Sequence, residues 1–204
     1  YIAVMDGDDI AMPERLEKQF FYLEKKPDII ALGTEYLSDS KSKEKIPLKY
    51  QDICLDLLSV FRTLHPSLMI RANMINSIGG YNEKYKYASD CDLYASLIFL
   101  GKVENLPDVL MTYRSHENQI SKAKIIEQNR YANIVQKKYQ KSFIDKYKSE
   151  EQDAILMPEL GMPEIGLSIC YYTYSKHCND GKFKEMADKT IDVIHKVITV
   201  DTPI

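Results

Sequence analysis

Three carboxylates stand within four residues near the start of the chain, in the run Asp6-Gly7-Asp8-Asp9. They follow the apolar residues 1–5, which have the composition of a buried strand. A strand that ends in acidic residues holds negative charge at the end of a sheet, where hard oxygen ligands bind divalent cations. A cation held there can in turn bind a diphosphate. The run therefore indicates a metal site of the kind that sugar-nucleotide chemistry requires.

Two other interpretations of this acidic run are a calcium loop and a helix cap. Glu17 falls at the twelfth position of a calcium loop counted from Asp6. The interior does not fit, because Ile10 occupies the fifth, ligand position and Ala11 the sixth, where the turn glycine belongs. The carboxylates can also serve only to stabilise the start of the following helix.

A second acidic group, Asp90 and Asp92, precedes the apolar residues 93–100. These residues predict a buried helix that Gly101 ends. Carboxylates at a helix N-terminus interact favourably with the helix dipole, so a purely stabilising role is one explanation of both acids.

The elements that must position these acids alternate in type along the chain. We expect strands at residues 1–5, 29–33, 67–71, 102–106 and 109–115. We expect helices at about residues 13–26, 52–61, 72–78, 93–100 and 123–148, with two more reaching about residue 200. In the first helix, Leu16, Phe20 and Leu23 recur at helical spacing. Residues 38–45 predict a polar loop, either a lid or a surface excursion.

The whole chain has the composition of a folded protein. It has 204 residues, 45% of them apolar, and a formal net charge of -3 with both signs interspersed, which argues against a nucleic-acid partner. The four cysteines form no C-x-x-C pair and fit reduced thiols in a cytoplasmic protein. We find no signal peptide and no apolar run that would span a bilayer. Because the chain opens on Tyr1 inside a predicted strand, we expect it to be the later part of a longer protein.

Five ordered segments resemble motifs of the family 2 glycosyltransferases, which are inverting enzymes of the GT-A fold. The segments are residues 1–19, the run HPSLMIR at 65–71, GGYNE at 79–83, SDCDLY at 89–94, and YRSH at 113–116 followed by Ser121. The resemblance implies an α/β fold, a GT-A-like mixed sheet flanked by helices, with an all-α C-terminal extension. Residues 1–122 would be the metal and acceptor half of that domain, and residues 123–204 a helical extension.

The resemblance also implies a metal site. Asp6 and Asp8 resemble the D-x-D pair of the family, and Asp8 or Asp9 would bind Mg²⁺ or Mn²⁺ under the donor diphosphate. His116 resembles a histidine that adds a nitrogen ligand or touches the diphosphate, although a surface histidine is an equal alternative. His65 precedes a strand, which favours a structural role over lining the donor side.

Asp90 matches the acid that serves as general base in the family, and Asp92 a neighbouring acid that orients the base or the acceptor. A sugar hydroxyl is a weak nucleophile at neutral pH, so a carboxylate must take its proton as the new bond forms. Arg114 is expected to pair either with phosphate or with Asp108. The family more often has Glu where this chain has Ser89.

The expected reaction transfers a sugar from a nucleotide-sugar donor, a UDP-sugar, to a glycan or lipid-linked acceptor in surface polysaccharide synthesis. The family's N-terminal half, which contacts the nucleoside, has no counterpart in this sequence. A truncated, non-catalytic assembly or glycan-binding module is therefore the rival interpretation. Residues 123–148 carry seven basic and two acidic residues, which permits peripheral contact with the inner face of a membrane but also fits a solvated helix face. The same helices can form a homodimer.

Overall fold

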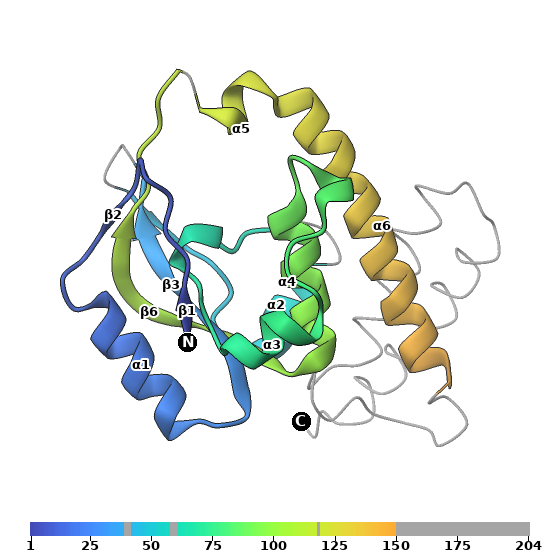
Figure 1. The fold of residues 1–204 in the computed structure, drawn as a ribbon, viewed down its shortest axis with the longest axis horizontal. Helices are drawn as coiled ribbons and strands as arrows, with labels where there is room; N and C mark the ends of the chain where they lie inside the picture. The colour runs from blue at the N-terminus through green and yellow to red at the C-terminus, as the bar shows by residue number, and fades with distance from the viewer. Residues whose placement is uncertain (39–41, 58–60, 118, 150–204) are drawn as a thin grey trace, which may run out of the picture. The chain divides into compact units, whose positions relative to one another are not determined.

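The computed structural model describes residues 1–38, 42–57, 61–117 and 119–149 (Figure 1). Two compact units divide the chain: one holds residues 1–57 and 61–135, and the other residues 58–60 and 136–204. All strands and all candidate site residues belong to the first unit. The helices expected beyond residue 149 lie outside the described residues, and the division into 1–122 and 123–204 stays a prediction.

The first unit is built on a mixed sheet with the strand order β1-β5-β3-β6-β2, and β4 pairs with β3. The strands are β1 (Ile2–Ala3), β2 (Ile10–Ala11), β3 (Ile29–Leu37), β4 (Lys43–Glu44), β5 (Met69–Ile70) and β6 (Lys102–Thr112). Among the described strands, only β3 and β6 run parallel. The expected α/β class with a mixed sheet and flanking helices is confirmed, and it is compatible with a GT-A-like fold.

Helices lie on both sides of β3 and β6, with α1 on one side and α2 and α4 on the other (Figure 1). The helices are α1 (Arg15–Lys25), α2 (Tyr50–Leu57), α3 (Ala72–Ser77), α4 (Ser89–Leu100), α5 (Ile120–Ala123) and α6 (Ile125–Ser149), with 3-10 turns η1 (His65–Ser67) and η2 (Glu83–Tyr85). Gly79 and Gly80 end α3 with φ of 78° and 79°, as their sequence predicts, because glycine adopts positive φ without a steric penalty.

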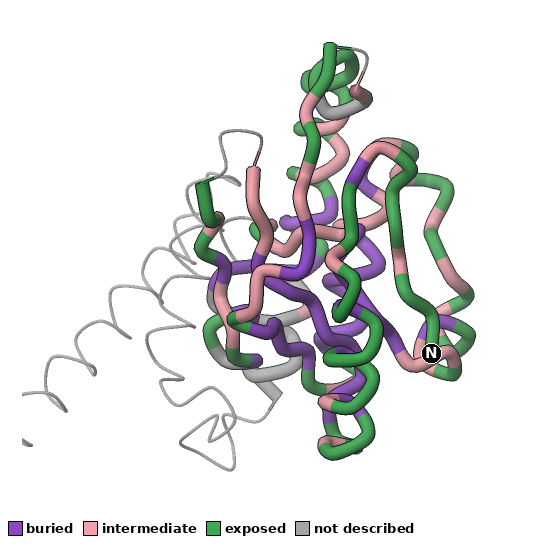
Figure 2. Tube along the Cα trace, turned by 90° about the vertical axis from the view of Figure 1, so that its left-hand side faces the viewer, coloured by how far each residue is buried: buried purple, intermediate pink, exposed green. Residues whose placement is uncertain are grey.

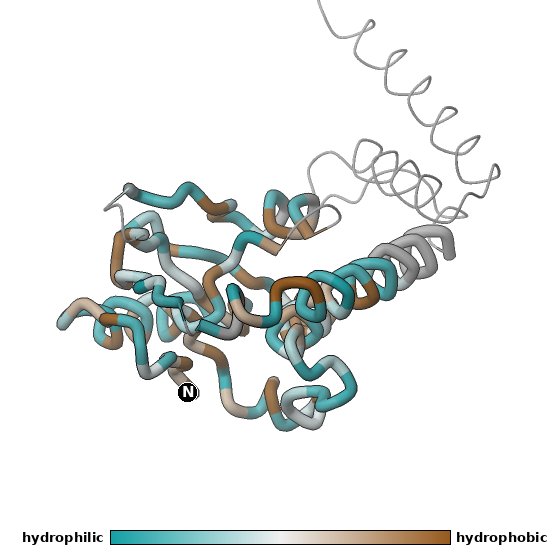
Figure 3. The backbone as a smooth tube through the Cα atoms, turned by 90° about the horizontal axis from the view of Figure 1, so that it is seen from above, coloured by the Kyte–Doolittle hydropathy of each residue, from teal (hydrophilic) through white to brown (hydrophobic). Residues whose placement is uncertain are grey.

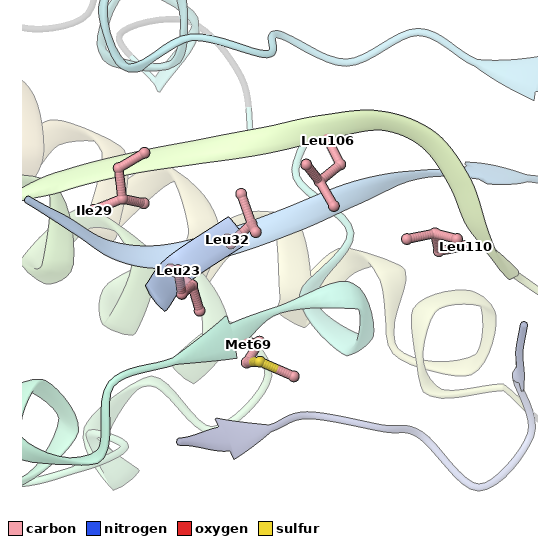
Figure 4. Packing of buried hydrophobic residues seen from close by; sticks show 6 residues of the cluster. All are labelled: Leu23, Ile29, Leu32, Met69, Leu106 and Leu110. Atoms are coloured by element: carbon pink, nitrogen blue, oxygen red, sulfur yellow. The ribbon is translucent and has the colours of Figure 1, made fainter. Parts of the chain in front are cut away.

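The core between α1 and the sheet consists of apolar side chains from α1 and from the three strands β3, β5 and β6. They are Leu23, Ile29, Leu32, Met69, Leu106 and Leu110 (Figure 4). In Figure 2 the buried segments run through the middle of the sheet, whereas the acidic loop and the turns around it are mostly exposed. This core fixes the strands whose ends carry the candidate site.

The first predicted strand is not buried. Only Ile2–Ala3 form β1, and both residues are exposed, Ile2 to 40%. The reason is position: β1 pairs with β5 on one side and, among the described residues, with no strand on the other. An edge strand lacks the second neighbour that would cover its apolar side chains.

The structure joins two predicted strands into a single strand. Residues 102–106 and 109–115 were expected as separate strands, but β6 runs through from Lys102 to Thr112. Thr34 pairs with Leu106 and Glu35 with Val109, so Pro107 and Asp108 form a bulge in the strand. A bulge accommodates proline because the extra residues need no ladder hydrogen bond.

Other boundaries also shift. The helix expected at 52–61 begins earlier, as α2 at Tyr50, and residues 58–60 lie outside the described part. Part of the expected loop at 38–45 pairs with β3 as β4. The short β2 had no signal in the sequence beyond two apolar residues after the acidic run.

The first helix buries an unexpected face. Of the apolar residues at helical spacing only Leu23 is buried, while Leu16 is 55% exposed. Gln19 occupies the buried position one turn before Leu23, and Arg15 the buried position two turns before it. The polar groups of both are satisfied by hydrogen bonds inside the fold, so the face that packs on the sheet is partly polar.

The helix expected at 123–148 is confirmed as α6, and the separate short helix α5 before it was not expected. Apolar residues recur along α6 between polar ones in Figure 3, the pattern of a helix with one packed face. Among the described helices, none is both long enough and apolar enough to cross a bilayer.

Candidate active site

The acidic run forms a compact carboxylate cluster. Asp6, Asp8 and Asp9 each offer an oxygen atom, and these atoms lie within 4.8 Å of one another. The N–H of Asp9 donates to the carbonyl of Asp6 over 3.2 Å, which closes the turn. Asp9 is buried, and its Oδ2 has no hydrogen-bond partner among the described residues. A buried oxygen without a donor is a free ligand position for a cation.

Short strands on either side hold this loop in place. Before it, the N–H of Val4 donates to the carbonyl of Leu68 over 2.8 Å, next to the β1–β5 pair. After it, Ile10 of β2 pairs with Thr112 of β6, and the N–H of Met12 donates to the carbonyl of Leu110. The acidic loop therefore spans the ends of two separate strand pairs of one sheet.

The three carboxyls experience different environments. Loss of water contact raises the pKa of Asp9, a hydrogen bond from the Arg114 N–H lowers it, and the charges of Asp8 and Asp6 raise it again. Loss of water contact also raises the pKa of Asp6, with His65 opposing and Asp8 and Asp90 adding to the rise. The hydrogen bond with His116 lowers the pKa of Asp8. The surroundings of Asp6 and Asp9 thus disfavour the ionised form of the carboxyl, whereas those of Asp8 favour it.

The segment after β6 folds back onto the acidic loop. The N–H of Arg114 donates to Asp9 Oδ1 over 3.0 Å, and the Arg114 guanidinium donates to the carbonyl of Asp8. His116 Nε2 lies 3.0 Å from Asp8 Oδ2. Asp108, the alternative partner expected for Arg114, instead accepts a hydrogen bond from Lys18 over 2.6 Å. Arg114 and His116 therefore lie beside the acidic loop, and Arg114 does not pair with Asp108.

A cavity of about 910 Å³ opens in front of the cluster. Asp6 and Asp8 line it together with His116, and Asp90 enters from the first turn of α4. The charges of Asp6 and Asp90 interact, since Asp90 contributes to the raised pKa of Asp6. Asp92 is buried two residues further along α4 and does not line the cavity, so it can act there only by supporting other groups.

His65 and Tyr81 form a part of the cavity wall that the sequence did not assign. His65 Nε2 and the Tyr81 hydroxyl are 3.0 Å apart, and their rings meet edge to face. Burial lowers the pKa of His65, while the charges of Asp90 and Asp6 raise it. His65 therefore lines the site instead of being purely structural. The sequence did contain a signal for Tyr81, because this residue directly follows Gly79-Gly80, where the chain turns.

The residues present fit a hard divalent cation. Three carboxylates supply oxygen ligands, one buried oxygen lacks a partner, and His116 adds a nitrogen next to Asp8. Among the described residues, this is the one group of three or more acidic, histidine or cysteine side chains close enough to share an ion. A cation would also relieve the repulsion that raises the pKa of Asp6 and of Asp9.

The mixed sheet thus carries a carboxylate cluster at its strand ends, and Asp6 and Asp8 of that cluster line one cavity with Asp90 of α4, an arrangement compatible with a GT-A-like fold. Several known glycosyltransferases are similar to this chain in sequence. The chain is 36% identical over 153 residues to an uncharacterized glycosyltransferase of Haemophilus influenzae, a match that covers 67% of this chain and 47% of the relative. It is 34% identical over 126 residues to the amylovoran biosynthesis glycosyltransferase of Erwinia amylovora, covering 59% of this chain and 47% of the relative.

A third relative is an O-antigen biosynthesis glycosyltransferase of Escherichia coli, 29% identical over 129 residues, with 60% of this chain and 50% of the relative covered. No protein-family model matches the chain. The chain spans about half the length of the curated relatives that it matches. The curated glycosyltransferases to which this chain is similar match about 60% of its length, and the resemblance drawn from its motifs is confirmed at that level.

Proposed function

We propose that this chain is the metal-binding and acceptor part of an inverting family 2 glycosyltransferase of the GT-A fold. The reaction transfers a sugar from a nucleotide-sugar donor, a UDP-sugar, to a glycan or lipid-linked acceptor. We place this reaction in the cytoplasm, at the inner face of a membrane, in the synthesis of a surface polysaccharide. Two of the relatives are named for amylovoran and O-antigen biosynthesis, which supports a polysaccharide product.

One observation carries the proposal: Asp90 and the acidic cluster line the same cavity, close enough for their charges to interact. A transferase of this kind needs a base for the acceptor and a negative site for a cation on opposite sides of one reacting sugar. Two acidic groups that are more than 80 residues apart in the sequence line one cavity, which supports such an arrangement.

In this mechanism Asp90 accepts the proton of the acceptor hydroxyl as that oxygen attacks the anomeric carbon. A single attack from the side opposite the leaving group inverts the anomeric configuration without a covalent intermediate. Asp6, Asp8 and Asp9 would hold Mg²⁺ or Mn²⁺, with His116 as a nitrogen ligand. When bound, the cation offsets the negative charge that develops on the leaving diphosphate.

Arg114 and Asp92 support these groups. The guanidinium of Arg114 donates to the carbonyl of Asp8, and in this proposal its positive charge attracts a diphosphate bound at the cluster. Asp92 is buried in the first turn of α4, and its role is to hold that turn and with it Asp90. A homodimer through residues 123–204 remains a prediction.

The proposal is tested by thermal unfolding of the chain with MnCl₂ and UDP. At about 100 times the dissociation constant, a ligand of the native state adds about 2.7 kcal/mol. For a chain of this size that raises the melting temperature by about 5–10 °C. Asp8→Asn should abolish the rise, because it removes a ligand that lies in the cavity.

The matched control is Asp90→Asn. This variant should keep the full rise with MnCl₂ and UDP but lose UDP release from UDP-sugars in the presence of membrane-extracted acceptors. Turnover that survives Asp90→Asn would remove Asp90 from the role of base. A wild-type chain that shows no rise at saturating MnCl₂ and UDP would favour the non-catalytic module.

A further inference from the structure

Arg15 is the most deeply buried charged side chain among the described residues, with 1% of its surface exposed. It lies at the start of α1, on the face that packs against the sheet. The described residues place no carboxylate within ion-pair distance of it, so its donors meet carbonyl, amide and sulfur acceptors. Desolvation lowers the pKa of the guanidinium, and the charge of Asp9 opposes that effect.

The contacts of Arg15 join the two segments that form the candidate metal site. One terminal nitrogen donates to the carbonyl of Val4 over 2.8 Å and lies 3.4 Å from the carbonyl of Leu68. The other lies 3.5 Å from the sulfur of Met5 and 3.0 Å from the sulfur of Met111. Met5 directly precedes Asp6, and Met111 stands three residues before Arg114.

The remaining donor fixes the guanidinium in its plane. The Nε–H of Arg15 donates to Gln19 Oε1 over 3.0 Å, and the Gln19 amide donates in turn to the carbonyls of Leu32 and Ser67. The fork is therefore anchored from the centre of the sheet and points toward the acidic loop. Its planar geometry lets one group contact several chain segments at once, which a lysine ammonium at the end of a flexible stem does less well.

Burying a cation without a paired anion is costly, and an apolar side chain would fill the same space without that cost. The retained guanidinium therefore points to a role beyond packing. We propose that Arg15 is a positioning residue that holds the segment before Asp6 against the segment leading to Arg114, and so sets the spacing of the cation ligands. This inference rests on the proposed metal site.

A simple counter-charge for Asp9 is the alternative explanation, and it predicts the opposite result. A counter-charge competes with a bound cation, so removing it would tighten cation binding. A positioning residue fixes the ligands in place, so removing it would weaken binding. Lysine separates the two, because it keeps the charge but loses the fork.

The test measures the dissociation constant of Mn²⁺ by electron paramagnetic resonance, well below the melting temperature of each variant. Arg15→Lys and Arg15→Met are both expected to weaken Mn²⁺ binding about 10-fold or more. Leu23→Ala is the matched control, since it lies two turns along the same buried face without contact to the acidic loop, and it should lower the melting temperature while leaving the Mn²⁺ constant unchanged.

Met111→Leu keeps the experiment decisive if the Arg15 variants fail to fold. It preserves volume but removes the sulfur that Arg15 contacts, so Mn²⁺ affinity should fall about 2- to 5-fold with little change in stability. The positioning role would be overturned if Arg15→Lys and Met111→Leu bound Mn²⁺ as tightly as the wild type, or if Arg15→Met bound it more tightly. Either result would still support the metal site itself. A wild-type chain that binds no Mn²⁺ would overturn the metal site and this inference together.

Discussion

The surroundings of Asp6 and Asp9 disfavour the ionised form of both carboxyls. The pKa of each is raised, chiefly by loss of water contact, so the native state holds their protons more tightly than the unfolded chain does. Such a group costs nothing below its unfolded pKa, and its cost grows as pH rises through the folded value. At neutral pH and without a cation, both carboxylates therefore weaken the fold.

Asp6→Asn should consequently stabilise the cation-free protein. We expect a rise of about 1–2 °C in melting temperature at pH 7, small because water screens an exposed carboxylate. The difference should shrink as the pH is lowered and vanish below the pKa of the unfolded chain, where the wild-type carboxyl is protonated in both states. With saturating MnCl₂ the order should reverse, because only the wild type gains the bound ion. Glu83→Gln, an exposed carboxylate outside the cluster, is the control, and a lower melting temperature of Asp6→Asn at pH 7 would contradict this account.

The acidic cluster was predictable from sequence because its members are adjacent, and His116 because it stands in a short ordered motif. Arg15 and Tyr81 were not assigned. Arg15 stands in a helix among other charged residues, and nothing local tells which charged residue faces inward. Which charged residue is buried depends on where α1 packs against the sheet. This packing is set by contacts between residues far apart in the sequence, such as Arg15 and Met111, which are 96 positions apart.

At the scale of elements, α1 shows how the sheet selects a helix face. The apolar spacing of the sequence favours a face through Leu16, whereas the fold buries Arg15 and Gln19 with Leu23. Tyr1 and Phe20 meet edge to face at 5.6 Å on the exposed side, next to β1. Hydrogen bonds from Arg15 and Gln19 connect this face to the carbonyl of Leu32 in β3 and to the carbonyls of Val4 and Ser67 beside the sheet, which favours burying it over the face through Leu16.

A matched pair of substitutions tests which face of α1 is packed. Leu23→Ala should cost about 2–5 kcal/mol, since it opens a cavity beneath a fully buried side chain. Leu16→Ala makes the same chemical change on the same helix and should stay within about 0.5 kcal/mol, because its side chain is largely exposed. Urea denaturation measures both. Equal losses for the two variants would mean that Leu16 is packed against another part of the protein.

The strand errors have a related cause. The sequence of β6 reads as two strands because Pro107-Asp108 is a turn signal, yet the parallel pairing with β3 continues across it as a bulge. Apolar residues 1–5 read as a buried strand because composition does not show whether a second neighbour is present. The local sequence pattern predicted these strands, but their pairing with other strands of the sheet determined their length and solvent exposure.

At the scale of the whole molecule, the described cavity brings Asp6 and Asp8 of the acidic cluster together with His116 and Asp90. Its charged lining is carboxylate, histidine and lysine or arginine, and the chain spans about half the length of its curated relatives. In the family that the motifs resemble, contacts to the nucleoside come from the N-terminal half. We therefore expect this chain to bind nucleoside diphosphates through the metal and the phosphates. Its affinity should depend little on which base the nucleotide carries.

Competition binding tests that expectation. In the presence of MnCl₂, the dissociation constants of UDP, GDP and ADP for this chain should agree within about threefold, which is less than 1 kcal/mol. Uridine alone should not bind measurably, because it lacks the diphosphate that a cation holds. Asp8→Asn should weaken all three diphosphates together. A preference of more than tenfold for UDP would place a base-reading pocket within this chain, and the unmatched half of the relatives would then be needed for some other part of the reaction.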